Sequence, residues 1–408
     1  MTECNIQNIE RSLDVNKSEQ ILNSFLKSEG LTSDIIFSDS NLEVSYITLI
    51  DSNGNRMASG GGKGKHHHIG SVAEAIEHYL FGLGTKNSSY KKLAIKSIAE
   101  QSIFENDFYL HHIFNENKND EIEYIKFNSF NNKQEWKIPA SIVDPGIYED
   151  GVQKSNSENQ LRKFSTNNGC ALGITLNDSL LHGLNECIER HYESLLYQEI
   201  LGLNTQIKWI VFNDSLCTDI KIKKEKIEKL FGKVIIIYCK TEATSFVAFS
   251  ILIDAEDKYC FTSIGAGSSF YLKVAVQRAI DELAQSLKLK TSPISETTEW
   301  KLEETIFNKM FESNNQLKHL KNISLANINS FVTNSDEDNY PFFEFTVEDQ
   351  LNYLLKNLIQ NSINPLYRVI KTNQKIVVTQ VFVPEFDRFF VIRKGNLVVP
   401  NIYYKINV

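Results

Sequence analysis

The chain has 408 residues, which is enough for one large α/β unit or for two domains. Its hydrophobic share of 42% and charged share of 23% are ordinary for a soluble globular protein, and its formal charge of −8 offers no basic surface to nucleic acid or an anionic membrane. No apolar run approaches the roughly 18 residues that cross a bilayer, and the first residues lack the basic and apolar segments of a secretory signal. We therefore expect a cytoplasmic protein that binds neither nucleic acid nor a membrane.

The six cysteines, at positions 4, 170, 187, 217, 239 and 260, include no closely spaced pair. This spacing argues against a structural zinc site and against a disulfide framework. No partner base is evident for Cys170 or Cys187, so buried thiols are a simpler interpretation than nucleophiles.

The composition predicts one continuous α/β (α+β) domain with short additions at its ends. Residues 1–43 form a polar, helix-prone N-terminal extension, residues 44–395 form the main domain, and residues 396–408 form a C-terminal tail. No long Pro- or Ser-rich linker divides the chain.

A pattern of β-rich run, glycine-containing loop and amphipathic helix occurs three times. The predicted strands cover 44–50, 136–143, and 244–254 with 258–264; the loops cover 59–70, 165–173 and 265–267; the helices cover 71–82, 176–201 and 268–289. Residues 292–360 are predicted to be mainly helical. A final β-rich stretch follows, in which 376–383, FFVIR (389–393) and LVVP (397–400) are predicted strands.

Each of the three helices carries acidic residues on one face. The polar faces hold Ser71, Glu74, Glu77 and His78 in the first helix, Glu186, Glu189, Arg190 and Glu193 in the second, and Arg278, Glu282 and Gln285 in the third. Like charges at this spacing destabilise a helix by about 0.2–0.5 kcal/mol per pair. A divalent cation is one candidate that would offset this repulsion, since Mg²⁺ takes oxygen ligands and is usually shared between carboxylates and phosphates.

For any one helix, acidic residues that face solvent would be the simpler explanation. The recurrence favours a shared site, because AEAIEHY (73–79) and NECIERHY (185–192) resemble each other and each follows a glycine-rich segment. Helix N-termini entered from such segments offer backbone N–H groups and the positive end of the helix dipole to phosphate oxygens. The pattern therefore indicates a metal and phosphate site.

The glycine segments do not match the common nucleotide-binding loops. GGGKGK (60–65) lacks the G-x-x-x-x-G-K-[ST] of a Walker loop, and Gly265-Ala266-Gly267 lacks the third glycine of a dinucleotide fingerprint. The acidic helix face below the latter would also repel a pyrophosphate unless a metal intervened. Both familiar nucleotide-binding folds are therefore disfavoured.

Five segments, in order along the chain, resemble landmarks of the YcaO family. They are GKGKHHHIGSVAEAIEHY (62–79), IPASIVD (138–144), STNNGCALG (165–173) with NECIERHY, IGAGSSF (264–270) with RAIDELAQ (278–285), and VFVPEFDRF (381–389). The first resembles a GKG followed by Ser-x-x-Glu-x-x-Glu-Arg. The resemblance extends from about residue 44 to 390 and implies mixed or antiparallel sheets, with amphipathic helices that surround ATP without a Walker loop.

The resemblance implies ATP and Mg²⁺ as cofactors and assigns site residues by position. The metal-side carboxylates would be Glu74, Glu77, Glu186, Glu189 and Glu282. Contacts to the nucleotide or its phosphates would come from Lys63, Ser71, Asn168, Arg190, Arg278 and Gln285. Arginine suits forked contacts with phosphate oxygens, whereas a solvated loop position is an equally simple interpretation of Lys63.

The resemblance also implies an ATP-dependent cyclodehydratase that acts on a ribosomally synthesised precursor peptide, as in bacteriocin biosynthesis. A Cys, Ser or Thr side chain of the peptide would add to a backbone amide, and the amide oxygen would leave as phosphate to give a thiazoline or oxazoline, the precursors of thiazole and oxazole. Residues 1–43 are too short for a leader-binding domain, so we expect a separate leader-binding partner similar to ubiquitin-activating enzymes. A flavin-dependent dehydrogenase is a further candidate partner, and a homodimer is an open alternative.

Two departures from the family pattern leave other functions open. His78 stands where the first signature has Arg, and the chain ends in NIYYKINV instead of the proline-rich tail of many azoline-forming members. One alternative is thioamide or amidine formation by an external sulfide or an internal amine. The other is a non-catalytic subunit that docks nucleotide or peptide.

Histidines offer two further candidates. Adjacent side chains such as His66-His67-His68 rarely converge on one ion, so this run is expected to face phosphate or solvent. His182 and His191 both flank the second acidic pair and either could be a general base. The sequence does not select one, so the catalytic base is left unassigned.

Overall fold

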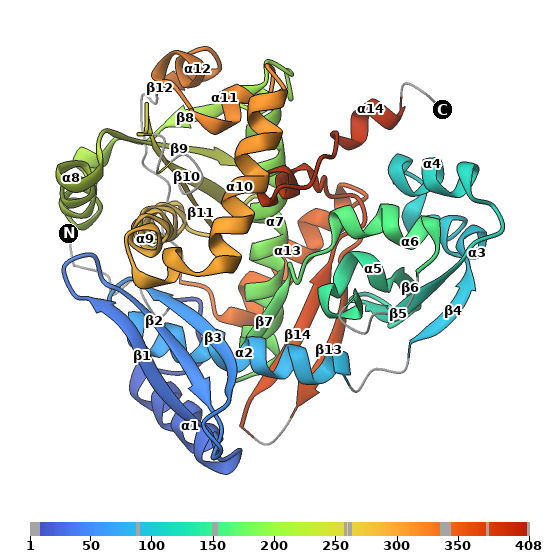
Figure 1. Cartoon of the computed structure of the whole chain (residues 1–408), viewed down its shortest axis with the longest axis horizontal. Helices are drawn as coiled ribbons and strands as arrows, with labels where there is room; N and C mark the ends of the chain where they lie inside the picture. Colours follow the sequence, from blue (N-terminus) through green and yellow to red (C-terminus); the bar gives the residue numbers. More distant parts are fainter. Residues whose placement is uncertain are drawn as a thin grey trace.

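The computed structural model describes residues 9–86, 90–148, 154–256, 259, 263–334, 344–372 and 375–405. Helices and largely antiparallel sheets are interleaved along the chain (Figure 1). The predicted α/β class with mixed or antiparallel sheets is therefore confirmed. Among the helices of these residues, none combines the length and the apolar character needed to cross a membrane.

The first sheet has three antiparallel strands in sequence order, with two helices packed on it. These elements are β1 (Thr32–Asp39), β2 (Val44–Ile50), β3 (Arg56–Lys63), α1 (Val15–Ser28) and α2 (His67–Lys86). Strand β2 matches the predicted strand 44–50, and α2 contains the predicted helix 71–82. The first 43 residues thus contribute both a helix and the edge strand β1, which pairs with β2.

The predicted loop 59–70 is reduced to residues 64–66, because Gly60, Gly61 and Gly62 lie in strand β3 and residues 67–70 lie in α2. A Cβ on Gly62 would collide with the carbonyl of His67, and one on Gly60 would collide with the backbone of Ser71 and Ala75. Helix α2 therefore lies against the strand backbone more closely than side chains allow. A strand made of glycines lacks the alternation of apolar residues by which strands are recognised.

The second sheet has the order β11-β10-β9-β8-β12, in which only β12 and β8 are parallel neighbours. Its strands are β8 (Trp209–Val211), β9 (Val234–Lys240), β10 (Phe246–Leu252), β11 (Ile264–Ser269) and β12 (Val332–Asn334), and the helices α8 (Thr218–Phe231) and α9 (Leu272–Lys290) share a core with it. Gly265 and Gly267, predicted to lie in a loop, instead lie within β11. A Cβ on either would collide with the backbone of α9, so this helix also packs directly on the strand backbone. Most of the predicted strand 258–264 lies outside the described residues.

The third sheet has the order β4-β5-β13-β14-β7, with β6 paired to β5. Its strands are β4 (Lys91–Ala94), β5 (Glu121–Ser129), β6 (Glu135–Pro139), β7 (Cys170–Gly173), β13 (Leu366–Thr372) and β14 (Val377–Phe382). The predicted strand 136–143 ends at Pro139 and continues as the short helix α5 (Ala140–Val143). Strand β13 was not predicted, because its alternation is interrupted by Arg368 and Lys371.

The prediction of final strands at 389–393 and 397–400 was wrong. FFVIR lies in the 3₁₀ helix η8 (Phe389–Lys394), and residues 397–400 have no regular structure. Phe389, Phe390, Val391 and Ile392 are all buried. A short continuous apolar run shows burial but does not distinguish a strand from a helix.

Helix α7 (Leu176–Ile200) runs through the middle of the molecule, between the second sheet and strands β7 and β14 (Figure 1). It begins at a capping box, in which Thr175 Oγ1 accepts from Asp178 N at 3.1 Å while Asp178 Oδ2 accepts from Thr175 N at 3.1 Å. Its apolar stripe is buried at Leu181, Leu184 and Ile188. One helix thus carries its polar stripe between the other two acidic helices.

The remaining elements surround this frame. They are α3 (Ile95–Ala99), η2 (Ser102–Phe104), α4 (Phe108–Glu116), η3 (Pro145–Tyr148), α6 (Asn156–Leu161), η4 (Arg162–Phe164), η5 (Asp214–Leu216), η7 (Pro293–Glu296), α10 (Thr298–Ser313), α11 (Lys318–Lys321), α12 (Leu325–Asn329), α13 (Val347–Gln360) and α14 (Asn401–Lys405). The predicted helical stretch 292–360 is largely helical where it is described. Cys170, Cys187 and Cys239 are buried free thiols, as expected; Cys4 and Cys260 lie outside the described residues.

Candidate nucleotide and metal site

The polar faces of α7 and α9 meet the end of β3 at one carboxylate. Lys63 Nζ lies 2.5 Å from Glu282 Oε2, and Arg190 Nη2 lies 3.6 Å from Glu282 Oε1. Arg190 also contacts Glu189 at 3.4 Å and Glu193 at 2.7 Å on its own helix. The structure therefore brings together four residues that the sequence predicted to share a site, Lys63, Glu189, Arg190 and Glu282.

The carboxylates of α2 and α7 bond to the backbone of glycine-rich segments. Glu77 Oε2 accepts from Leu172 N at 2.8 Å, and Glu186 Oε2 accepts from Gly169 N at 3.2 Å. Glu74 bonds to the backbone of Gly61 in β3. These bonds hold the predicted metal-side carboxylates against the β3 and β7 segments.

Negative charge exceeds positive charge in this buried cluster. Burial, and then the neighbouring Glu186 and Glu74, raise the pKa of Glu77 well above its usual value. Burial and Glu282 raise the pKa of Glu189 to about 7, although Arg190 acts in the opposite direction. Buried carboxylates that repel one another in this way are stabilised by an added cation.

Glu282 behaves differently from its neighbours. Burial opposes its ionisation, but the charges of Lys63 and Arg190 outweigh burial and lower its pKa. Glu282, Glu189 and Glu74 in turn raise the pKa of Lys63, against the effect of burial. Glu282 is therefore ionised and available as a cation ligand over the whole physiological pH range.

No group of three or more His, Cys, Asp or Glu side chains within the described ranges could hold a metal ion unaided. Mg²⁺ usually takes only one or two carboxylates from the protein and completes its shell with water and substrate phosphates. The excess of buried carboxylates fits a cation that arrives together with phosphates. The predicted residues therefore fit Mg²⁺ bound with ATP better than a metal site formed by protein side chains alone.

A cavity of about 320 Å³ adjoins the carboxylate cluster. Its walls come from the N-terminal segment and α1, from the first turns of α2 and α7, and from the first half of α9. Their polar and glycine residues are Glu10, Arg11, Ser18, Lys63, Gly64, Lys65, His66, Gly70, Gly173, Asp178, Gln277, Arg278 and Asp281. Helix N-termini and basic side chains both favour phosphate. The volume lies within the usual range of small-molecule sites, which is roughly 300–1,000 Å³.

Of the six predicted nucleotide contacts, only Lys63 and Arg278 line this cavity. Arg190 lies beside it at Glu282, and the other three are held elsewhere. Ser71 is fully buried, and its Oγ accepts from Ser45 Oγ at 3.2 Å and donates to the His68 carbonyl at 2.8 Å. The amide of Gln285 lies against Gly61, where a Cβ would collide with it. Asn168 lines a different pocket, so the structure does not gather all six predicted contacts at one place.

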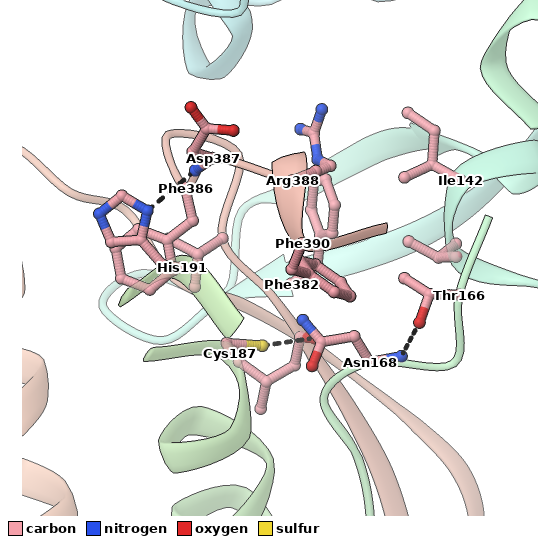
Figure 2. Close-up of a pocket in the computed structure, with 13 residues that line it drawn as sticks. Ile142, Thr166, Asn168, Cys187, His191, Phe382, Phe386, Asp387, Arg388 and Phe390 are labelled. Carbon is pink, nitrogen blue, oxygen red and sulfur yellow. Dashed lines mark hydrogen bonds between the residues drawn. The ribbon is translucent and has the colours of Figure 1, made fainter. Parts of the chain in front are cut away.

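Asn168 belongs to a small pocket between α7, β14 and the 166–168 loop (Figure 2). Its backbone N donates to Thr166 Oγ1 at 3.1 Å, and its carbonyl accepts from Gln380 at 3.4 Å. Its side-chain Oδ1 is buried without a hydrogen-bond partner among the described residues. This oxygen would accept a donor from a bound molecule, and the pocket of about 30 Å³ has room for a water.

His191 lines the same pocket and is held as a neutral side chain. Its ring stacks on Phe386 at a centroid distance of 4.4 Å, and its Nδ1 accepts from Asp387 N at 3.0 Å (Figure 2). Burial lowers its pKa to about 4, against the effect of Glu242. Because Nδ1 is an acceptor, Nε2 carries the proton, and His191 has no free lone pair with which to act as a base.

His182, the other candidate base, faces the cations of the site. Burial and then the charges of Arg11, Arg278 and Lys63 hold its pKa well below its usual value. Its Nδ1 is buried without a hydrogen-bond partner within the described part of the chain. His182 is therefore neutral and, unlike His191, keeps a free ring nitrogen.

The sequence did not identify the contribution of residues 9–14. Glu10 and Arg11 line the cavity, although they lie outside every recognised segment. Their polar surroundings have no periodicity, so no sequence signal distinguished them from a solvated extension. Asp281 was also missed, because its partner Lys223 lies on α8 and the two meet only in the folded chain.

Comparison with known proteins gives the family. A family model described as YcaO cyclodehydratase, ATP- and Mg²⁺-binding, matches residues 61–387. A comparison with curated proteins found no match.

Solved structures give the fold. The YcaO from Methanopyrus kandleri bound with AMPPCP and Mg²⁺ superposes with a TM-score of 0.60 at 13% identity, covering 96% of this chain and 97% of that one. A heterocyclase in complex with substrate and cofactor gives 0.59 at 14% identity, covering 92% of this chain and 53% of that one. The E. coli microcin synthetase McbBCD complex gives 0.56 at 16% identity, covering 90% and 96%. The fold is thus that of YcaO structures, and, since the family model spans most of its length, the chain belongs to the YcaO cyclodehydratase family, an ATP-dependent enzyme family with ATP and Mg²⁺ as cofactors.

Proposed function

We propose that this chain is the ATP-dependent cyclodehydratase subunit that forms thiazoline or oxazoline rings in a ribosomally synthesised precursor peptide. The observation that carries the proposal is the position of Glu282, which contacts Lys63 and Arg190 beside a cavity lined by Arg278. A carboxylate, two flanking cations and a cavity with arginine and lysine in its walls are what a magnesium–triphosphate group requires. Membership of the cyclodehydratase family supports the reaction class.

ATP, when bound, supplies the phosphoryl group that makes the amide oxygen a leaving group, and Mg²⁺ offsets the phosphate charge. The protein residues bind and orient. Glu189 and Glu282 would hold the cation together with the other predicted carboxylates, and Arg190 and Arg278 would hold phosphate oxygens. Lys63 and Arg190 keep Glu282 ionised for this task.

The partners belong to the same proposal. One structural neighbour is a heterocyclase solved with substrate, and another is the multi-chain McbBCD microcin synthetase complex. These neighbours support a peptide substrate and a partner subunit that binds the leader of the precursor. A flavin-dependent dehydrogenase would then oxidise the azoline to the aromatic ring.

The proposal is tested by mixing the chain with Mg–ATP, a Cys- and Ser-rich precursor peptide from a neighbouring gene and its leader-binding partner. We expect release of ADP and phosphate that depends on the peptide, and loss of one water per ring from the peptide mass. The variant Glu282→Gln should abolish both signals. Replacement of an oxygen by sulfur in the product would instead show a thioamide-forming enzyme, and Mg–ATP binding without any turnover would show a docking subunit.

A further inference from the structure

The segment that precedes α1 is held across the nucleotide cavity at two points. Gln350 Nε2 of α13 donates to the carbonyl of Ile9 at 2.8 Å. On the other side, Ser12 N donates to Asp178 Oδ1 of α7 at 2.8 Å. Of the two residues between these anchors, Glu10 is 6% exposed and therefore points into the protein.

The carboxylate of Glu10 pairs with Arg278, which the proposed function assigns to the nucleotide. Its Oε2 lies 2.5 Å from Nη2 of Arg278, and its Oε1 accepts from Ser269 Oγ in β11. The other terminal nitrogen of Arg278, Nη1, donates to the carbonyl of Ser268 at 2.7 Å. Both ends of the guanidinium fork are thus engaged, one of them by a carboxylate of the same chain.

We propose that Glu10 is a built-in competitor of the nucleotide, and that a phosphate group binds Arg278 only after it displaces the Glu10 carboxylate. The inference rests on the proposed function, which places the phosphates in this cavity. Carboxylate and phosphate use the same forked geometry on arginine, so they compete for one edge of the group. A buried carboxylate also repels an anion that enters beside it.

Glu10 lies outside the segments that resemble the family, so the proposed competition does not follow from those segments. Residue 10 precedes the matched region 61–387. Competition by Glu10 would lower the affinity of the chain for free ATP. The nucleotide cavity would then fill completely only under conditions that move the segment 9–12. A partner subunit or peptide that contacts this segment would then control nucleotide binding.

A positioning role for Glu10 predicts the opposite result. If the carboxylate only oriented Arg278 for phosphate, Glu10→Gln would weaken nucleotide binding. If it competes, the same variant strengthens binding, by roughly threefold to tenfold, the effect of one partly buried charge contact. A gain in binding could also come from the general loss of one negative charge. The two explanations differ at Arg278, because only competition requires that residue.

The experiment measures Mg–ATP binding to the full chain by calorimetry for wild type, Glu10→Gln, Arg278→Gln and the double variant. We expect a gain for Glu10→Gln that disappears in the Arg278→Gln background, as in a double-mutant cycle. Glu19→Gln, on the exposed face of α1, is the matched control and should bind like wild type. Glu10→Ala should reproduce the gain if the glutamine variant folds poorly.

Unchanged or weaker binding by both Glu10 variants overturns the inference, as does a gain of the same size without Arg278. These outcomes leave the proposed function intact, since the wild-type chain would still bind Mg–ATP. Failure of wild type to bind Mg–ATP would instead overturn the proposed function, and the inference with it.

Discussion

Lys63 and Glu282 form an ion pair of 2.5 Å that joins β3 to α9 across 219 positions of sequence. The sequence assigned the two residues to different ligands, Lys63 to the nucleotide and Glu282 to the metal. In the structure each neutralises the other, and Arg190 shares the carboxylate at 3.6 Å. In the proposed site, Glu282 would bind the metal cation once phosphates draw Lys63 and Arg190 towards themselves.

Loss of this carboxylate should stop turnover. In Glu282→Gln, Lys63 and Arg190 lose their common partner and the cation loses a ligand, so peptide-dependent phosphate release should fall by roughly 10²–10³-fold. The control is Glu304→Gln on α10, which removes an ion pair of 2.6 Å between Glu304 and Lys290 of α9. Activity of Glu282→Gln within tenfold of the Glu304→Gln control would rule out this role.

Glu189 should make the stability of the protein without Mg–ATP depend on pH. Its pKa rises from 4.5 to about 7 on folding, so the folded chain retains a proton that the unfolded chain has lost. The stability from this proton is fully present below pH 4.5 and is lost as the pH rises through about 7, by at most about 1.4 kcal/mol per pH unit.

Urea unfolding across this pH window checks the effect. Glu189→Gln cannot titrate, so its free energy of unfolding should fall less steeply with pH than that of wild type. If Glu189 is a metal ligand as proposed, Mg–ATP will bind its ionised form and should stabilise wild type more at about pH 8 than at about pH 6. Equal slopes for the two proteins would contradict the raised pKa.

His191 should be dispensable as a proton acceptor. In His191→Asn the amide oxygen can still accept from Asp387 N, so turnover should stay within about threefold of wild type, with an unchanged pH–rate profile. The measurement is peptide-dependent phosphate release as a function of pH, alongside thermal unfolding. A loss of about 100-fold with unchanged unfolding would make His191 a catalytic residue after all.

The glycine contacts between strand and helix should determine stability. Gly62→Ala places a methyl group on the carbonyl of His67 and should lower the free energy of unfolding by about 2–3 kcal/mol or more. Gly82→Ala, in helix α2 away from β3, meets open space and should instead raise it by about 0.5–1 kcal/mol. Urea unfolding compares the two, and equal effects would show that α2 can move away from β3.

The sequence predicted what lies within single elements. The polar faces of α7 and α9 were recognised because residues three, four and seven apart lie together on any helix. Val276, Ala279 and Ile280 of α9 are buried. Strand β2 was found because its apolar residues form a clear run. Both predictions depend only on local spacing.

Contacts between elements that are distant in the sequence could not be predicted from local spacing. Strand β3 was taken for a loop because its glycines meet α2 and have no side-chain pattern, and Ser71 was assigned to the nucleotide although Ser45 of β2 engages it. Glu10 gave no signal because its partner Arg278 is 268 positions away and α9 reaches it only after folding. The division at residues 44 and 395 stays a prediction, and residues 406–408 of the tail lie outside the described structure.

The glycine-lined contacts of β3 with α2 and of β11 with α9 have a mechanical consequence. With backbone against backbone, neither helix has a compressible layer of side chains on which to slide or tilt, so each strand and its helix move as one rigid part. Adaptation to ligands of different size must then come from side-chain rotation and from the chain before α1. Engineering of nucleotide preference should therefore begin with residues 9–14 and leave the helix–strand pairs untouched.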